Sequence, residues 1–181
     1  IKITSKEENL DNKDLIGFIG APWTLLIYML NKQSPKKNSI GNIYKYPNQR
    51  ELIQKIVKTQ KLHIKKQVEN GVSIIQIFDS WAGLLDKEKL NEYVYQPTYE
   101  LVEYTKSLGV EIICFPRGIE SYEEYCDIVK PNAINIDYNV DPNKIAKNIK
   151  IPVQGGMDPN CLLLEKNEML KNAKKYLDIF K

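Results

Sequence analysis

Seven polar or aromatic side chains that could contact a ligand follow short apolar runs of the chain: Trp23, Thr24, Tyr28, Asp79, Ser80, Arg117 and Asp137. In parallel α/β proteins the carboxyl ends of the strands share one face, where ligands bind. Trp23 and Tyr28 fall in the first two turns of a helix expected from Pro22, where they can lean over the end of the preceding strand. An arginine directly after a buried strand is expected to point into the same mouth. Its forked donors suit a carboxylate.

The same residues also have ordinary structural roles open to them. The aromatic pair could be core residues of an amphipathic helix. The arginine could form a surface ion pair. The remaining acidic and hydroxyl residues could cap a helix or stabilise a turn: Asp79, Ser80 and Asp137.

Two further features invite a chemical interpretation. The Gln-Gly-Gly-Met-Asp-Pro segment at 154–159 could bind phosphate, but it has no Lys, Ser or Thr at a helix start. Its glycines could equally allow close approach of backbone. His63, the single histidine, lies mid-helix without partners at metal-ligand spacing, and we interpret it as structural. We therefore expect no metal site.

The elements that must position these residues alternate between strands and helices. Buried strands are expected at 15–19, 72–78, 110–115, 133–136 and 151–154. Helices are expected from Pro22, from Pro47 to about 70, from a cap at Asp86 with a kink or restart at Pro97, and over 121–129, 144–148 and 164–180.

This alternation predicts a parallel sheet. A doubly wound sheet and a (β/α)₈ barrel would both bind ligands at strand carboxyl ends, and the lack of a G-x-G-x-x-G fingerprint favours the barrel. Five units cannot close a (β/α)₈ (TIM) barrel. We therefore expect residues 1–181 to form a single α/β domain that is a portion of one.

Composition narrows the function classes. The chain is 43% apolar and 27% charged, as in globular proteins. The net charge is only +3, and its lysine-dominated basic residues are scattered, which argues against nucleic-acid binding. No apolar run approaches the ~18 residues of a membrane span. Three widely spaced cysteines without a C-x-x-C pair favour a reducing cytoplasm over disulfides or zinc. Without an initial methionine or a signal peptide, the chain is expected to be cut from a longer one.

Three motifs, in order, make the chain resemble the uroporphyrinogen decarboxylases. They are Gly-Phe-Ile-Gly-Ala-Pro-Trp-Thr-Leu-Leu-Ile-Tyr-Met at 17–29, Gln-Ile-Phe-Asp-Ser-Trp-Ala-Gly at 76–83 and the glycine segment at 154–159. The first is the most specific, and the likeness spans essentially the whole chain. It implies a (β/α)₈ barrel, usually a homodimer. It also implies decarboxylation of the four acetate arms of a tetrapyrrole, uroporphyrinogen III, to coproporphyrinogen III in haem biosynthesis, without a metal or organic cofactor.

The resemblance also assigns roles to residues. Tyr28 and Ser80 would reach the carboxylate arms, Phe78 would line the cleft, and Arg117 stands where relatives often have a lysine. The family's aspartate and arginines lie upstream of residue 1 in the family pattern, and its active-site histidine lies downstream of residue 181. No catalytic residue is therefore expected within this chain, and the 181 residues alone are expected to be inactive.

Two alternatives remain. A corrinoid- and zinc-dependent methyltransferase of the same superfamily would need a His-x-Cys ligand pair, where this chain has Cys-Phe-Pro-Arg at 114–117. A non-catalytic fragment, from a different functional class, would oligomerise or aggregate through exposed strand edges.

Overall fold

A computed structural model describes residues 1, 13–35, 40, 43 and 46–181. Five strands form one parallel sheet: β1 (Ile16–Gly20), β2 (Ile74–Asp79), β3 (Glu111–Pro116), β4 (Ala133–Ile136) and β5 (Val153–Gly155). Their order in the sheet is their order in the sequence, as in the wall of a barrel. In a doubly wound sheet the order of the strands would reverse at a switch point. The expected parallel α/β sheet is confirmed, and its order is that of a portion of a barrel.

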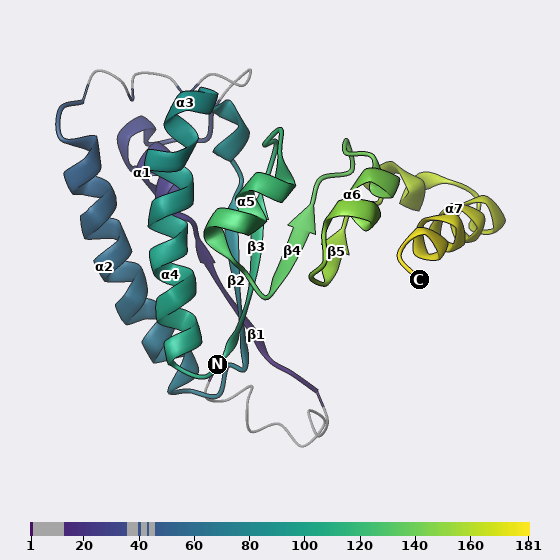
Figure 1. The fold of residues 1–181 in the computed structure, drawn as a ribbon, viewed down its shortest axis with the longest axis horizontal. Helices are drawn as coiled ribbons and strands as arrows, with labels where there is room; N and C mark the ends of the chain where they lie inside the picture. Colours follow the sequence, from purple (N-terminus) through teal and green to yellow (C-terminus); the bar gives the residue numbers. More distant parts are fainter. Residues whose placement is uncertain (2–12, 36–39, 41–42, 44–45) are drawn as a thin grey trace.

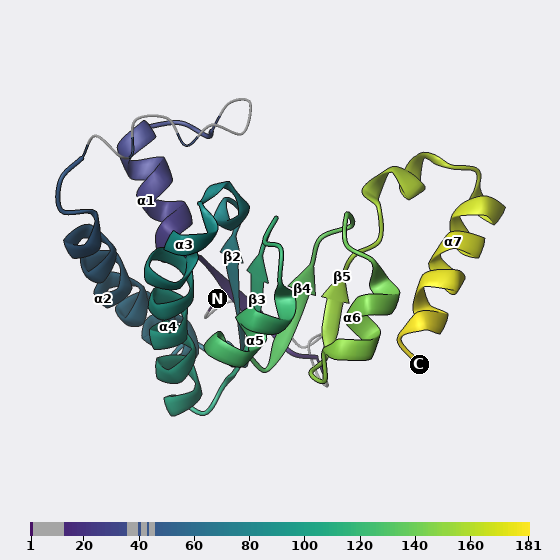
Figure 2. The ribbon, with the colours of Figure 1, turned by 45° about the horizontal axis from the view of Figure 1, so that its top comes forward.

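The helices lie on one face of this sheet and at its far end (Figures 1 and 2). They are α1 (Pro22–Asn31), α2 (Gln49–Val68), α3 (Lys87–Leu90), α4 (Gln96–Ser107), α5 (Tyr122–Val129), α6 (Pro142–Asn148) and α7 (Lys166–Ile179). Short 3₁₀ turns occupy η4 (Ala82–Leu84) and η6 (Pro159–Leu163), and η5 (Asn91–Tyr95) is a π-helical turn. Within the described ranges, no helix is long and apolar enough to cross a membrane.

Several helix starts follow the expected local chemistry. Pro22 opens α1, and the Ser121 hydroxyl accepts the Glu124 backbone N–H at the start of α5. Asp86 occupies the expected position directly before α3, but its carboxylate makes no cap hydrogen bond and instead lies 3.3 Å from the Lys89 ammonium. The restart expected at Pro97 coincides with the change from the π-helical turn to α4.

Helices cover one face of the sheet and leave the opposite face open (Figures 1 and 2). Side chains alternate along each strand, so Ile19, Ile75 and Ile112 share the face that packs under the helices, and all three are buried. On the opposite face Phe18 is 67% exposed. The rings of Phe18, Phe78 and Phe115 meet edge to face there, with centroids 6.1 and 6.3 Å apart. In a barrel this second face would be the interior.

Two glutamines of α2 contact the backbone of β1. Gln67 Nε2 donates to the Phe18 carbonyl at 3.0 Å, and Gln60 Nε2 donates to the Gly20 carbonyl at 3.1 Å. Both side chains are buried, so these bonds satisfy amide groups that are shielded from water. The apolar stripe of α2 therefore contains two polar residues with a defined task.

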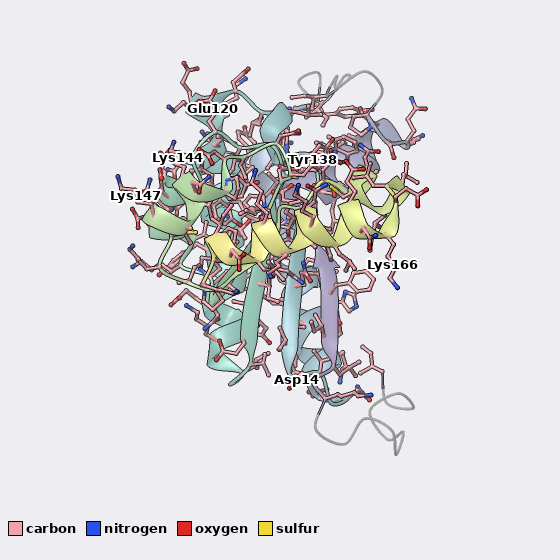
Figure 3. The ribbon with its side chains drawn as sticks, turned by 90° about the vertical axis from the view of Figure 1, so that its right-hand side faces the viewer. Asp14, Glu120, Tyr138, Lys144, Lys147 and Lys166 are labelled. Carbon is pink, nitrogen blue, oxygen red and sulfur yellow. The ribbon has the colours of Figure 1, made fainter. Side chains whose placement is uncertain are left out.

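At the far end of the sheet, α7 runs across the strands (Figure 3). Gly156, at φ +86°, precedes it, and a Cβ there would lie 1.8 Å from the Tyr176 hydroxyl of α7. A Cβ at Gly155 would lie 2.3 Å from Asn135 Oδ1. Of the two interpretations of the glycine segment, the structure supports close approach.

Candidate functional site

Chain segments after β2, β3 and β4 form a pocket at one end of the sheet. In Figure 3, Asp14, just before β1, and Tyr138, just after β4, mark the two opposite ends of the strands. The pocket has a volume of about 240 Å³ and lies at the carboxyl ends. Its lining residues are Ser80, Trp81, Gly83, Leu84, Arg117, Gly118, Asp137 and Asn139. Two of the four expected substrate contacts, Ser80 and Arg117, are therefore in one pocket.

Tyr28 lies beside this pocket and does not line it. Its ring, on α1, packs edge to face on Trp81 with centroids 6.5 Å apart, and its side chain is partly exposed. Phe78 lies two residues before Ser80 on the uncovered face of the sheet, between Phe18 and Phe115. Trp23 is a core residue, 1% exposed, whose ring packs on Tyr93.

Asp137 forms the centre of a hydrogen-bond network at the base of the pocket. Its Oδ2 accepts the Gly118 backbone N–H at 2.5 Å and the Tyr122 hydroxyl at 3.2 Å. Its Oδ1 lies 3.6 Å from Nε of Arg117. The carboxylate is buried, whereas half of the Arg117 side chain is exposed. Arg117 is thus held at its Nε, and its other N–H donors remain for a ligand.

Asp79 is placed differently from its neighbour Ser80. It is 1% exposed and faces the helices, where its Oδ1 accepts the Thr24 hydroxyl at 2.6 Å and its Oδ2 has no hydrogen-bond partner among the described residues. Burial raises the pKa of this carboxyl to about 7, and the Thr24 hydroxyl and the backbone N–H groups of Trp81 and Thr24 act in the opposite direction. Asp79 therefore does not line the pocket.

Among the residues that the structure describes, no set of zinc ligands is grouped around Cys114. This thiol is fully buried on the helix-covered face of β3, and burial raises its pKa to about 12. Metal binding requires the thiolate, which such a site disfavours. His63 is exposed on α2, 3.2 Å from Gln67 Nε2. In the described part of the chain, no three His, Cys, Asp or Glu side chains are grouped to hold a metal.

Sequence reasoning missed Asn139 and the role of Gly83. Asn139 lines the pocket two residues after Asp137, and its position in the turn after β4 was the available signal. Gly83 N–H donates to the Arg117 carbonyl at 2.9 Å, and its Cα lies close to Gly118. The turns after β2 and β3 are therefore in backbone contact. The types of residue in these turns do not predict that contact.

Comparisons with known proteins agree on one family. The family model described as Uroporphyrinogen decarboxylase (URO-D) matches residues 1–181. The chain is 41% identical over 175 residues to the uroporphyrinogen decarboxylase of Wolbachia pipientis wMel, covering 93% of this chain and 51% of that protein. It is 35% identical over 180 residues to that of Orientia tsutsugamushi (strain Ikeda), covering 96% and 52%. The chain spans about half the length of the curated relatives it matches.

Proposed function

Because this chain belongs to the uroporphyrinogen decarboxylase family, we propose that it forms part of an enzyme that decarboxylates the acetate arms of uroporphyrinogen III to give coproporphyrinogen III. One observation carries the proposal beyond the family match. Ser80 and Arg117, on turns after different strands, line one pocket at the carboxyl ends of the sheet. A hydroxyl and a guanidinium at this position suit a substrate rich in carboxylates.

The proposed roles combine the family resemblance with the positions of these residues. Arg117, held at Nε by Asp137, binds a carboxylate arm, and the Ser80 hydroxyl donates to the same group or a neighbouring arm. The Tyr28 hydroxyl donates a hydrogen bond to a carboxylate arm from the side of α1, next to Trp81. The ring of Phe78, on the aromatic inner face, contacts the macrocycle. These groups bind and orient the substrate.

Decarboxylation itself needs a place for the electrons of the breaking bond. A pyrrole protonated beside the acetate is a cation that accepts them, so catalysis consists of stabilising that cation over the neutral ring. The family resemblance assigns this to an aspartate that receives the pyrrole N–H groups, assisted by arginines that hold the carboxylates, and none of the residues discussed above is given that role. No metal or organic cofactor is part of the proposal. A homodimer is proposed on the same resemblance, and a cytoplasmic location on the three widely spaced cysteines.

We expect the 181-residue chain, assayed alone, to form no coproporphyrinogen from uroporphyrinogen, because it spans about half the length of the curated relatives and the residues proposed here only bind and orient the substrate. The measurement is chromatography of the products after anaerobic incubation, with an intact family member as positive control. Coproporphyrinogen formed by the purified chain would contradict the division of roles proposed above.

In an intact enzyme carrying this segment, Tyr28→Phe and Ser80→Ala are each expected to lower kcat/KM by about 10- to 100-fold. A hydrogen bond to a charged group contributes about 1.5–3 kcal/mol, which corresponds to that range. The measurement is the rate of coproporphyrinogen formation, with circular dichroism to verify that both variants remain folded.

Matched controls come from α4, outside the pocket. Tyr104→Phe and Ser107→Ala remove the same hydroxyls from residues that lie under Lys61 and at the helix end. They are expected to leave kcat/KM unchanged. Wild-type rates for Tyr28→Phe and Ser80→Ala, or equal losses in the controls, would contradict the site assignment.

A further inference from the structure

A single buried hydroxyl connects the two segments that carry Tyr28 and Ser80. Thr24 Oγ1 donates to Asp79 Oδ1 at 2.6 Å and accepts the Trp81 backbone N–H at 3.3 Å. Asp79 and Trp81 are the residues immediately before and after Ser80. One oxygen atom of α1 therefore bonds the side chain of the residue before the expected substrate contact and the backbone of the residue after it.

The same junction also determines where Tyr28 lies. Tyr28 follows Thr24 by four residues, one turn further along α1, and its ring packs on Trp81. The Trp23 indole N–H donates to the Trp81 carbonyl at 3.0 Å, which fixes the next peptide group, on the other side of the same residue. A change in the Thr24 contact would thus move Ser80 and Tyr28 relative to each other.

Burial of the Asp79 carboxyl at this contact lowers the free energy of unfolding. Asp79 is almost fully buried, one of its oxygens has no partner, and the groups behind it on β3 and α5 are the Cys114 thiol and the Tyr125 hydroxyl, neither of them cationic. A buried carboxyl without a compensating charge costs free energy that a well-packed apolar pair would not. Such a cost is typical of residues retained for a site and not for the core.

We propose that Thr24 and Asp79 are positioning residues: their hydroxyl–carboxyl bond sets the separation between the Tyr28 side of the site, on α1, and the Ser80 side, after β2. The inference rests on the proposed function in that Ser80 and Tyr28 contact the substrate. Neither Thr24 nor Asp79 touches the substrate, because both side chains are buried behind the strand end.

The test compares three substitutions of buried threonines. Thr24→Val removes the hydroxyl and keeps the shape, and Thr24→Ser restores the hydroxyl. Thr105→Val is the matched control, because Thr105 is fully buried in α4 and its hydroxyl donates to the Leu101 carbonyl within the helix, away from the pocket. Each variant is made in the 181-residue chain, for fluorescence, and in an intact enzyme carrying the segment, for kinetics.

In the kinetic arm, Thr24→Val is expected to lower kcat by about 10- to 100-fold, since a displacement of about 1 Å between binding groups has effects of this size. KM is expected to change less than kcat. Thr24→Ser is expected to recover most of the loss, and Thr105→Val to stay within about threefold of wild type at a similar loss of stability. Wild-type kcat in Thr24→Val, no recovery in Thr24→Ser, or an equal loss in Thr105→Val would overturn the proposal.

The fluorescence arm needs no substrate and separates this inference from the proposed function. In a Trp23→Phe background the emission reports Trp81 alone, since the chain has two tryptophans. Thr24→Val is expected to shift that emission, and Thr24→Ser and Thr105→Val to preserve it. If the intact wild-type enzyme does not convert uroporphyrinogen, the proposed function fails. In that case the positioning role is overturned if the Trp81 emission is unchanged in Thr24→Val. It is supported if the emission shifts in Thr24→Val and returns to the wild-type value in Thr24→Ser.

Discussion

The free energy of unfolding is expected to fall by up to about 4 kcal/mol as the pH rises from about 4 to about 8, because Asp79 must ionise inside the protein. Burial raises the pKa of this carboxyl from 3.8 to about 7. About three pH units separate the two values, and each unit corresponds to about 1.4 kcal/mol. For a domain of this size the change is a large fraction of total stability.

The direction follows from proton counting. Between pH 3.8 and about 7 the unfolded chain has released the Asp79 proton while the folded chain still holds it. The folded state therefore binds more protons, and its stability decreases as the pH rises through this window. Below it both states are protonated, and above it both are ionised, so the contribution of Asp79 is level on either side.

The measurement is urea denaturation of wild type and Asp79→Asn across this pH range. An asparagine keeps an acceptor for the Thr24 hydroxyl and cannot ionise. The difference in unfolding free energy between the two proteins is expected to change with pH in favour of the variant. Asp86→Asn, at an exposed carboxylate, is the control and is expected to preserve the wild-type slope. Parallel curves for wild type and Asp79→Asn would show that Asp79 does not titrate in this window.

Gly83→Ala is expected to disrupt the pocket and lower stability by about 3 kcal/mol, at the upper end of ordinary overpacking costs. A Cβ at this position would lie 2.1 Å from the Gly118 carbonyl oxygen and 2.7 Å from the Gly118 Cα. Both are backbone atoms that no rotamer change can move. The turns after β2 and β3 would have to separate, and with them Ser80 and Arg117. A loss of kcat/KM of about 100-fold or more is expected in an intact enzyme.

Gly109→Ala provides the matched comparison. Gly109 has φ +77° at the end of α4, and a Cβ there would meet no atom within 4 Å. Alanine at this site costs only backbone strain, about 1 kcal/mol, and kcat/KM is expected to be retained. The measurements are denaturation midpoints and steady-state rates for both variants. Equal effects of the two substitutions would show that the contact between the turns is not required.

The strands were predictable because short apolar runs rich in β-branched residues favour buried strands. The expected strand at 133–136 coincides with β4, and the others differ from the structure by one or two residues at their ends. Those small differences decide side-chain direction. β2 runs to Asp79, one residue beyond the expected end at Phe78, so Asp79 continues the alternation of Ile75 and Ile77 toward the helices. A residue that follows a strand and the last residue of a strand face different environments.

Tertiary contacts account for the features that sequence reasoning missed. Helical periodicity alone does not indicate that the amides of Gln60 and Gln67 bond strand carbonyls. The backbone contact between Gly83 and Gly118 depends on two turns 35 residues apart in sequence. Such pairings arise only when the sheet is assembled.

The bonds from α2 to β1 also occupy carbonyl groups at the outer edge of the sheet. The Leu15 carbonyl and the Ala21 N–H bond toward β2, so the carbonyls of Phe18 and Gly20, of opposite parity, face the outer edge. A strand arriving at that edge would have to compete with Gln60 and Gln67 for these acceptors. Closing the sheet into a barrel pairs both of its edges, so these two glutamines would have to release the carbonyls of Phe18 and Gly20 to a neighbouring strand.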